Sequence, residues 1–330
     1  MNILYTVNDK FVPQLATGIC SVCENNSQEK TIHFYVFSLG ITEQNKEKLE
    51  QLVEKYKRVV SIIEIEDMRN YLDFEFDTLG WNPVILARLF MSKILPADVE
   101  KILYMDGDTI VCRSLNELWN YDLKGKTLGM SVEPTADRQR KNALGLQNYY
   151  YHNSGVLLVD LNKWREIKAE ELIVDFYRKR EGKLFAADQD AINGALKDEI
   201  CPLPPKYNYC NIYDQYPYRF LCKLMRPMTY FSEAEFKDSQ KNPVIIHYLG
   251  EERPWRQGNT HKYKKDYNKY LNMTYWKDTP EEEGWQLYFL CWTIFNIVTK
   301  PFPQLRYSII NYLIPYFMKY RARKLKKDKV

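Results

Sequence analysis

The first third of the chain alternates between apolar runs of strand length and segments in which apolar residues recur with helical spacing. Short apolar runs typically form strands, and apolar positions three and four residues apart form the buried face of a helix. This pattern predicts strands over residues 2–7, 32–38 and 59–65, separated by helices over residues 12–24 and 42–56. Such an alternation favours a parallel sheet with crossover helices.

The middle of the chain continues this alternation. A helix is predicted over residues 84–95, between Pro83 and Pro96, because proline favours the first turn of a helix and the positions after its end. The next predicted strand covers residues 102–105. Further strands are predicted over residues 128–132, 156–161 and 244–247, and a helix over residues 186–196 with Asp188 as its candidate N-cap. The predicted fold class is therefore α/β, with a mixed, mostly parallel sheet flanked by helices.

The composition changes after about residue 260, which predicts a main domain over residues 1–260 and a helical C-terminal region over residues 261–330. The apolar run over residues 285–298 is shorter than the about 20 residues that span a bilayer. Residues 305–318 are aromatic and apolar, and a basic tail follows. Such helices with a basic flank are typical of attachment to an anionic membrane surface, which we expect for residues 285–330. The alternative is that they pack on the main domain.

Charge is concentrated in that tail. The chain has a net charge of +4, and residues 319–330 contain seven basic residues and one acidic residue, so the remainder is close to neutral. A domain without a basic face is not expected to bind nucleic acid. The seven cysteines are spread along the chain, with one C-x-x-C at Cys20 and Cys23 and no second such pair, and the first residues lack a basic segment followed by a long apolar stretch. We therefore expect reduced thiols and a cytoplasmic protein, peripheral on the inner face of the cell membrane.

Two carboxylates follow the predicted strand over residues 102–105, namely Asp106 and Asp108, with Gly107 between them. Like charges at a buried strand end repel each other, so a positive group is expected there, and a divalent metal is the first candidate. In open α/β sheets, ligands bind beyond the carboxyl ends of the strands, and Gly107 would allow close approach to the backbone. The alternative for this short pattern is a turn with exposed acids.

His247 ends another predicted strand and could complete the site. Two carboxylates and an imidazole suit Mn²⁺, with Mg²⁺ also possible. Arg253 follows six residues later and offers a fixed positive charge that suits a diphosphate.

Four segments of the chain carry a family resemblance: YMDGDTIV at 104–111, HNSGVLLVDLNKW at 152–164, AADQDAING at 186–194 and HYLGEERPW at 247–255. In this order and spacing they resemble the motifs of family 8 retaining glycosyltransferases, with the bacterial lipopolysaccharide α-galactosyltransferases and their relatives as the nearest group. The resemblance extends from residue 1 to about residue 255. It implies a GT-A fold, a UDP-sugar donor and a requirement for Mn²⁺.

The resemblance also implies roles for single residues. Asp106, Asp108 and His247 would hold the metal. Asn153, Asp188 and Gln189 would surround the donor sugar as catalytic residues, and Glu133 stands where relatives often have an aspartate facing the acceptor. Contacts to the donor nucleotide are implied for Thr6, Val7, Asn8, Asp9, Arg88, Asp106, Gly107, Asp108, Gly250 and Arg253.

The residue expected behind the reacting sugar carbon is Gln189, whose amide is a weak nucleophile, so we favour a same-face substitution. Retaining glycosidases instead use a carboxylate nucleophile, and the alternative here is a covalent intermediate on Asp188 or Asp190. From the resemblance we expect galactose or glucose as the donor sugar and a glycan, glycolipid or glycoprotein as the acceptor. The loop over residues 71–81 and the C-terminal region are expected to select the acceptor.

Other functions fit parts of the sequence. MDGDT at 105–109 also resembles phosphatases with an aspartyl nucleophile, although the motif would then follow three strands and His247 would have no role. A non-catalytic module that binds a UDP-sugar or carbohydrate is a second alternative. Self-glucosylation of the glycogenin type, on the tyrosines at 149–151, is a third.

Overall fold

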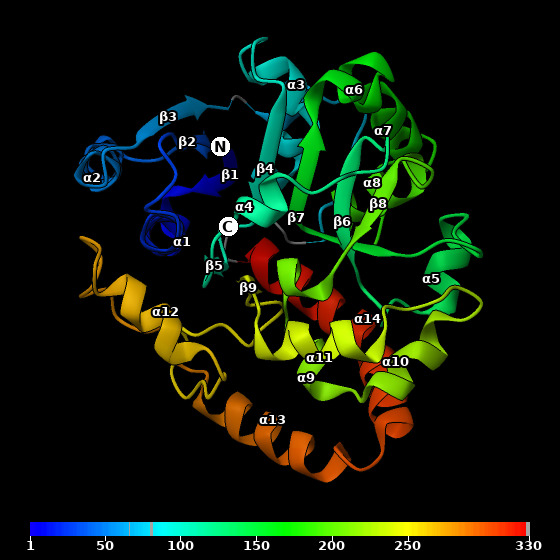
Figure 1. Cartoon of the computed structure of the whole chain (residues 1–330). Coiled ribbons are helices and arrows are strands. Elements are labelled where there is room, and N and C mark those ends of the chain that lie inside the picture. Colours follow the sequence, from blue (N-terminus) through cyan, green and yellow to red (C-terminus); the bar gives the residue numbers. More distant parts are fainter. Residues whose placement is uncertain (66, 80–81, 328–330) are drawn as a thin grey trace.

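The computed structural model describes residues 1–65, 67–79 and 82–327, with side chains up to residue 318. The predicted basic tail over residues 319–330 therefore lies outside the described side chains, as do residues 80 and 81 of the predicted acceptor loop. Within the described chain, the centre of the molecule is a seven-stranded sheet (Figure 1). Its strands are, in spatial order, β3 (Val59–Glu64), β2 (His33–Leu39), β1 (Asn2–Asn8), β4 (Lys101–Met105), β7 (His152–Asp160), β6 (Leu128–Val132) and β8 (Ile200–Leu203).

The direction of β7 makes the sheet mixed. β7 runs antiparallel to its neighbours β4 and β6, whereas the other neighbouring strands pair in parallel. The prediction of a mixed, mostly parallel sheet flanked by helices is confirmed. Because β7 is reversed, its first residues lie at the edge of the sheet where the other strands end.

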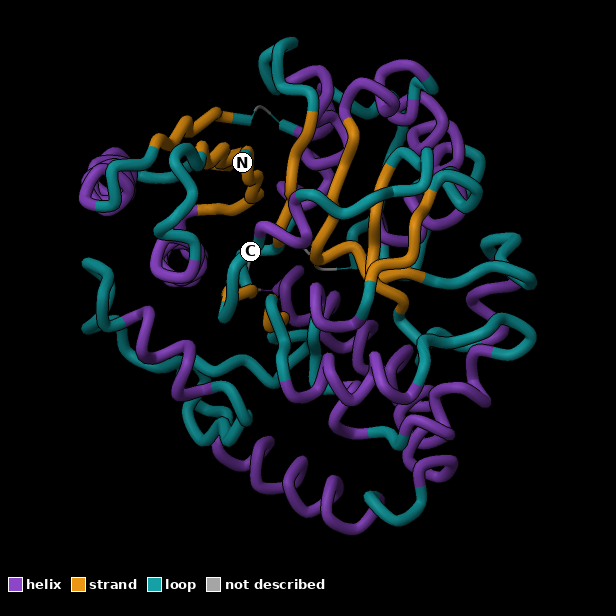
Figure 2. Tube along the Cα trace, in the orientation of Figure 1, coloured by secondary structure: helices purple, strands orange, loops and turns teal. Residues whose placement is uncertain are grey.

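Helices cover both faces of this sheet (Figure 2). One face packs against η3 (Pro83–Phe90), α3 (Met91–Ile94), α6 (Leu161–Glu166), α7 (Ala169–Arg178) and α8 (Ala187–Ala195), and the other against α1 (Val12–Asn25) and α2 (Glu43–Lys55). On β1, Leu4 faces the first layer while Ile3 and Tyr5 face the second. A strand covered on both sides buries residues of both parities, which explains the continuous apolar runs in the sequence.

A second, two-stranded sheet pairs β5 (Thr109–Val111) with β9 (Ile245–His247) in antiparallel fashion. Neither β5 nor β8 was predicted, because three and four residues are too few to show a periodicity. The pairing places Thr109 opposite His247. It therefore joins the segment after β4 to the segment that precedes Arg253.

Two details of the predicted helices differ from expectation. The predicted helix over residues 84–95 begins as the 3₁₀ helix η3 and becomes α-helical only at α3. The N-cap position of α8 is Ala186, not Asp188, and Asp188 lies in the first turn. Its carboxylate forms an ion pair with Arg88.

A third core cluster consists largely of aromatic side chains and lies below the sheet edge in the orientation of Figure 1. Tyr213, Tyr248, Trp255 and Tyr267 are buried in it. The high tyrosine content thus serves packing in this part of the molecule.

Shorter helices connect these parts of the described chain. They are η1 (Asp9–Phe11), η2 (Met68–Asn70), α4 (Asn116–Trp119), α5 (Arg138–Ala143), η4 (Pro205–Asn208), α9 (Ile212–Gln215), α10 (Tyr218–Met225), α11 (Glu233–Lys241) and α12 (Lys264–Leu271).

The last two helices are α13 (Gln286–Thr299), which lies along the lower side of the molecule, and α14 (Pro303–Lys327), which runs from the lower right toward the middle of the view (Figure 1). Arg306 of α14 is buried and lies over the rings of Tyr216, Trp292 and Phe295. Because Tyr216 follows α9, this arginine joins both terminal helices to the main domain. None of the described helices is both long and apolar enough to cross a membrane.

Candidate functional site

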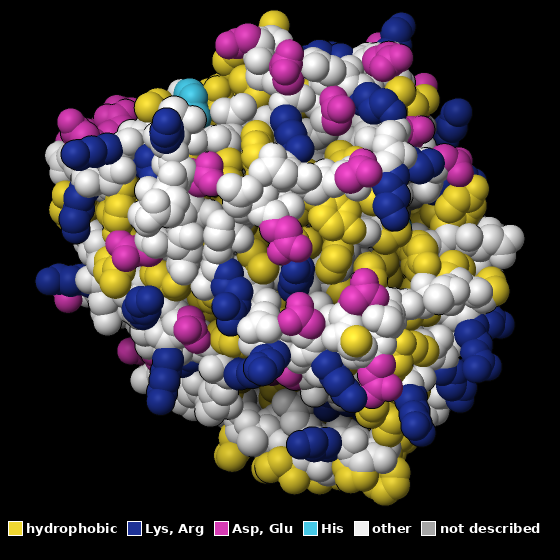
Figure 3. Space-filling model, in the orientation of Figure 1, with side chains coloured by type: hydrophobic (Ala, Val, Ile, Leu, Met, Phe, Trp, Pro, Cys, Tyr) yellow, Lys and Arg dark blue, Asp and Glu magenta, His cyan; other side chains and the backbone are white. Residues whose placement is uncertain are grey.

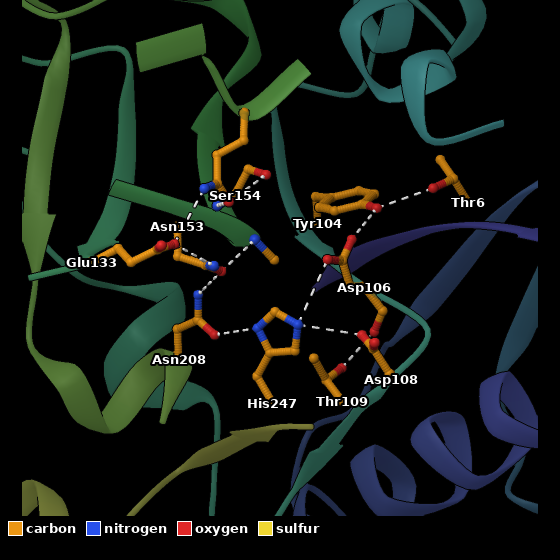
Figure 4. A network of polar contacts seen from close by, with 12 residues as sticks. Thr6, Tyr104, Asp106, Asp108, Thr109, Glu133, Asn153, Ser154, Asn208 and His247 are labelled. Atoms are coloured by element: carbon orange, nitrogen blue, oxygen red, sulfur yellow. Dashed lines mark hydrogen bonds and ion pairs between the residues drawn. The ribbon is translucent and has the colours of Figure 1, made fainter. Parts of the chain in front are cut away.

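The two carboxylates and the histidine singled out in the sequence lie together where β4, β5 and β9 meet. Among the described residues, Asp106, Asp108 and His247 form the cluster that could hold a metal ion, with ligand atoms all within 4.8 Å of one another. His247 Nε2 lies 3.3 Å from Asp108 Oδ1 and 3.8 Å from Asp106 Oδ2 (Figure 4). Two hard oxygens and one imidazole nitrogen fit Mn²⁺ or Mg²⁺.

The turn between Asp106 and Asp108 is held by a side-chain hydrogen bond and by packing against β1. Thr109 Oγ1 donates a hydrogen bond to the Asp106 carbonyl, at 2.8 Å. A Cβ at Gly107 would lie 3.0 Å from a ring carbon of Phe11 and 3.2 Å from Val7. Gly107 and Val7 are therefore in contact, and the glycine allows the turn to pack against β1.

Hydrogen bonds fix which nitrogen of His247 faces the carboxylates (Figure 4). Asn208 Nδ2 donates to Asn153 Oδ1 at 2.8 Å, so Asn208 Oδ1 is left to accept from His247 Nδ1 at 2.9 Å. His247 Nε2 is then unprotonated in the neutral ring and can act as a ligand. Asn208, at the end of η4, was not predicted, because a single asparagine in an irregular segment carries no sequence signal.

Positively charged side chains and one hydroxyl stabilise the negative charges of Asp106 and Asp108. Arg88 NH1 donates to Asp106 Oδ1 at 2.9 Å, and Tyr104 donates to the same oxygen at 2.6 Å. Burial opposes ionisation of Asp108, but His247 and Arg253 outweigh it and lower its pKa. Burial also opposes protonation of His247, but the two carboxylates outweigh it and raise its pKa.

Arg253 lies next to Asp108. Its guanidinium lies over the rings of Phe11 and Trp255, 5.6 Å from each centroid, and 3.4 Å from Asp108 Oδ2. Its buried Nε has no hydrogen-bond partner among the described residues. A guanidinium held in place with an unused donor is suited to an anionic ligand such as a diphosphate.

Arg88 connects this cluster to α8. The side chain is buried, and its Nε lies 2.7 Å from Asp188 Oδ2 while NH1 contacts Asp106. Burial raises the pKa of Asp188 to about 6, although Arg88 opposes that shift. Asp188 is thus held by an arginine rather than exposed to a ligand.

Gln189 and Asn153 lie on the other side of the cluster, with Glu133 between them. Gln189 Oε1 accepts from the Ser154 backbone N–H at 2.9 Å, and Gln189 Nε2 donates to Glu133 Oε2 at 3.2 Å. Asn153 Nδ2 donates to the same Glu133 oxygen at 3.0 Å. The site therefore extends from the Asp106–Asp108–His247 cluster, through Asn208 and Asn153, to Glu133 and Gln189.

The remaining predicted residues lie at the ends of β1 and β9. Thr6 bonds to the Tyr104 hydroxyl at 3.0 Å, near Asp106. Asp9 accepts hydrogen bonds from Thr42 and Asn45 at the start of α2, which leaves its Oδ1 fully engaged. Asn8 is partly buried at the end of β1, and Gly250 adopts a φ of +74° in the turn before Arg253.

Comparison with known proteins agrees with this geometry. The sequence profile described as Glycosyl transferase family 8 matches residues 2–259. General stress protein A of Bacillus subtilis (strain 168) is 25% identical over 280 residues, which cover 84% of this chain and 94% of that protein. A lipopolysaccharide 1,2-glucosyltransferase of Escherichia coli (strain K12) is 25% identical over 289 residues, 84% of this chain and 79% of that protein.

Among solved structures, the galactosyltransferase LgtC in complex with donor and acceptor sugar analogues has the same fold, with a TM-score of 0.71. Its sequence is 23% identical, and the match covers 87% of this chain and 99% of that one. The resemblance inferred from the four sequence segments is confirmed, and the phosphatase alternative is not supported.

Proposed function

Because the chain belongs to glycosyl transferase family 8, we propose that it transfers galactose or glucose from a UDP-sugar to a glycan, glycolipid or glycoprotein, with retention of configuration. One observation carries the proposal. The ligand atoms of Asp106, Asp108 and His247 lie within 4.8 Å of one another, beside Arg253, whose Nε has no hydrogen-bond partner in the described part of the chain. The names of two relatives, a lipopolysaccharide 1,2-glucosyltransferase and a galactosyltransferase, support a hexose donor.

The same residues define how the chain would handle the donor. Asp106, Asp108 and His247 would hold Mn²⁺, or alternatively Mg²⁺, which when bound would neutralise the charge of the departing diphosphate. Arg253 would bind the diphosphate from the other side. Thr6, Val7, Asn8 and Asp9 would line the nucleoside end, and Gly250 would give the backbone of the β9 turn access to the phosphates.

We propose same-face substitution as the reaction. The bond from sugar to phosphate breaks, the acceptor oxygen bonds to the same face of that carbon, and a leaving phosphate oxygen takes the acceptor proton. The contacts of the two candidate nucleophiles support this route. Asp188 is paired with Arg88, and Asp190 accepts from Arg140 Nε at 2.9 Å and from Tyr151 at 2.7 Å. Carboxylates bound in this way are poor nucleophiles.

Release of UDP from UDP-galactose and UDP-glucose tests the proposal. With Mn²⁺ we expect release that EDTA abolishes and that Asp108→Asn lowers by about 10²-fold or more, because one ligand carboxylate is lost. Asp98→Asn, which changes an exposed acid, is the matched control. Metal-dependent UDP binding without release from either sugar would contradict the donor assignment, and absence of UDP binding would overturn the whole proposal.

We also propose that the protein is cytoplasmic and attaches to the inner face of the cell membrane through α13 and α14. Figure 3 shows hydrophobic side chains gathered at the lower edge, where Figure 1 places α13. The exposed apolar residues of α13 recur with helical spacing and so form one stripe: Leu287, Leu290, Ile294, Ile297 and Val298. A surface of this kind fits a lipid acceptor presented at a membrane.

A further inference from the structure

Apart from Asp9 at the end of β1, five carboxylates lie in the described site, and four of them belong to the candidate metal cluster or to ion pairs with arginine. Asp106 and Asp108 belong to the cluster that could hold a metal. Asp188 and Asp190 are almost completely buried and paired with Arg88 and Arg140, respectively. The fifth is Glu133, which follows β6 directly.

Glu133 differs from the other four in its partners. It is only partly buried, and the hydrogen bonds to its side chain come from the neutral amides of Asn153 and Gln189. Among the described residues no cation pairs with it within 4.0 Å. Amide donors orient a carboxylate without cancelling its charge, so the negative charge of Glu133 is held in place and remains available.

The partners of Glu133 are themselves fixed. The Glu133 backbone N–H donates to the Tyr151 carbonyl at 2.8 Å, and Gln189 Nε2 donates to the Tyr151 hydroxyl at 2.8 Å as well as to Glu133. On the other side, Asn153 is connected through Asn208 to His247. Glu133 is therefore positioned relative to both Gln189 and the proposed metal ligands (Figure 4).

From this arrangement we infer that Glu133 is a catalytic carboxylate that contacts the transferred sugar and stabilises the positive charge developing on its ring. The inference rests on the proposed function and deepens it. Glycosyl transfer passes through a state with oxocarbenium character, and a preorganised negative charge of fixed orientation stabilises such a state. The competing role is contact with the acceptor alone, without any effect on the donor sugar.

Hydrolysis of the UDP-sugar without any acceptor separates these roles, because water then replaces the acceptor. We expect Glu133→Gln to lower the rate of UDP release at saturating donor by about 10²-fold, the scale of losing one preorganised electrostatic group. The affinity for UDP in the presence of Mn²⁺ should stay within about threefold of the unchanged protein, since the inferred contact is to the sugar. Glu199→Gln is the matched control, because Glu199 lies outside the site and accepts from Thr127.

Glu133→Asp provides a second variant if the amide impairs folding. It keeps the charge but withdraws it by one methylene, so we expect an intermediate rate with unchanged UDP affinity. Unchanged hydrolysis in Glu133→Gln would overturn the inference and assign the residue to the acceptor, while the proposed function would stand. Absence of UDP release from the unchanged protein would overturn the donor assignment and this inference with it.

Discussion

At the scale of single residues, the site depends on side chains that orient others. Asp106, Asp108 and His247 could be selected from the sequence because acids and a histidine at strand ends are rare and costly unless compensated. Asn208 could not be selected, since its importance arises only when folding places its amide between His247 and Asn153. Arg88 was expected to contact the donor, which stays a prediction, and its ion pairs with Asp106 and Asp188 could not be foreseen from the sequence.

Asn208→Leu should weaken Mn²⁺ binding by about 10- to 100-fold, the usual cost of losing a group that orients a metal ligand. Without the amide, His247 Nδ1 loses its acceptor and the ring is free to turn. A Mn²⁺ titration in the presence of UDP measures the effect. Asn26→Leu is the control, because Asn26 is equally buried but bonds to backbone groups outside the site. Equal Mn²⁺ affinity in both variants would contradict the assignment.

His152 makes stability dependent on pH. Burial lowers the pKa of its imidazole from 6.5 to about 4, and its Nε2 has no partner among the described residues. Between these values the unfolded chain binds a proton that the folded chain does not, so stability falls as the pH falls through this window. From about pH 7.5 to about pH 5 we expect a loss of about 2 kcal/mol from this group.

His152→Phe should remove that part of the pH dependence, because the ring would no longer titrate. Urea unfolding of both proteins at the two pH values measures the difference. Asn193 Oδ1 keeps a donor in the variant, since it also accepts from the backbone N–H of residue 152 at 2.8 Å. The same pH dependence in both proteins would show that the histidine is not the group responsible.

At the scale of elements, the apolar strands and the amphipathic helices were predictable from the apolar pattern, and so was the three-residue strand β9, whereas the short strands β5 and β8 were not. β7 was predicted to begin at residue 156, but it begins at His152. Its first four residues, His-Asn-Ser-Gly, look like a loop because they are polar or small. These residue types occur here because this end of β7 forms part of the site. The side chains needed there are determined by their contacts in the site and not by strand propensity.

Gly155 shows how closely β7 approaches the proposed metal ligands. A Cβ at this position would lie 2.3 Å from His247 Cε1 and 3.0 Å from Asn153 Oδ1, so Gly155→Ala must displace the imidazole. We expect at least about a tenfold loss of Mn²⁺ affinity and loss of UDP release, with the fold retained. Gly145→Ala provides a control for general destabilisation away from the site, because its φ of +73° strains an alanine while no atom within 4 Å would be displaced. Undisturbed Mn²⁺ binding in Gly155→Ala would argue against His247 as a ligand.

At the scale of the whole molecule, the change in composition near residue 260 indicated the C-terminal helices but not how they are held. Arg306 lies in an apolar, aromatic stretch of the sequence. From the sequence alone, an arginine at that position only interrupts the apolar pattern and does not indicate a packing role. In the structure it bonds to Thr299 and lies between aromatic rings of α13 and the main domain. Phe289 is buried, whereas many other apolar side chains of these two helices, among them Leu287 and Ile297, are exposed. No pattern within one helix could reveal which of them the main domain covers.

Replacing Leu287, Leu290 and Ile294 together by Gln should lower binding to vesicles containing anionic phospholipid by about tenfold or more, since each side chain contributes apolar area to the interface. Cosedimentation measures the bound fraction. Leu172→Gln is the control, because this exposed leucine lies on α7. UDP release without acceptor should be equal in all three proteins. Equal vesicle binding would place the attachment elsewhere or exclude it.

The pairing of β5 with β9 has a consequence for how the protein acquires its activity during synthesis. The two strands are separated by more than a third of the chain, so their contact closes a long loop and forms only after most of the protein has been made. Asp106 and Asp108 leave the ribosome long before His247 does. A nascent chain would therefore carry the acidic half of the proposed metal site without the imidazole, and the onset of tight cation binding at that site would mark the moment at which the domain is complete.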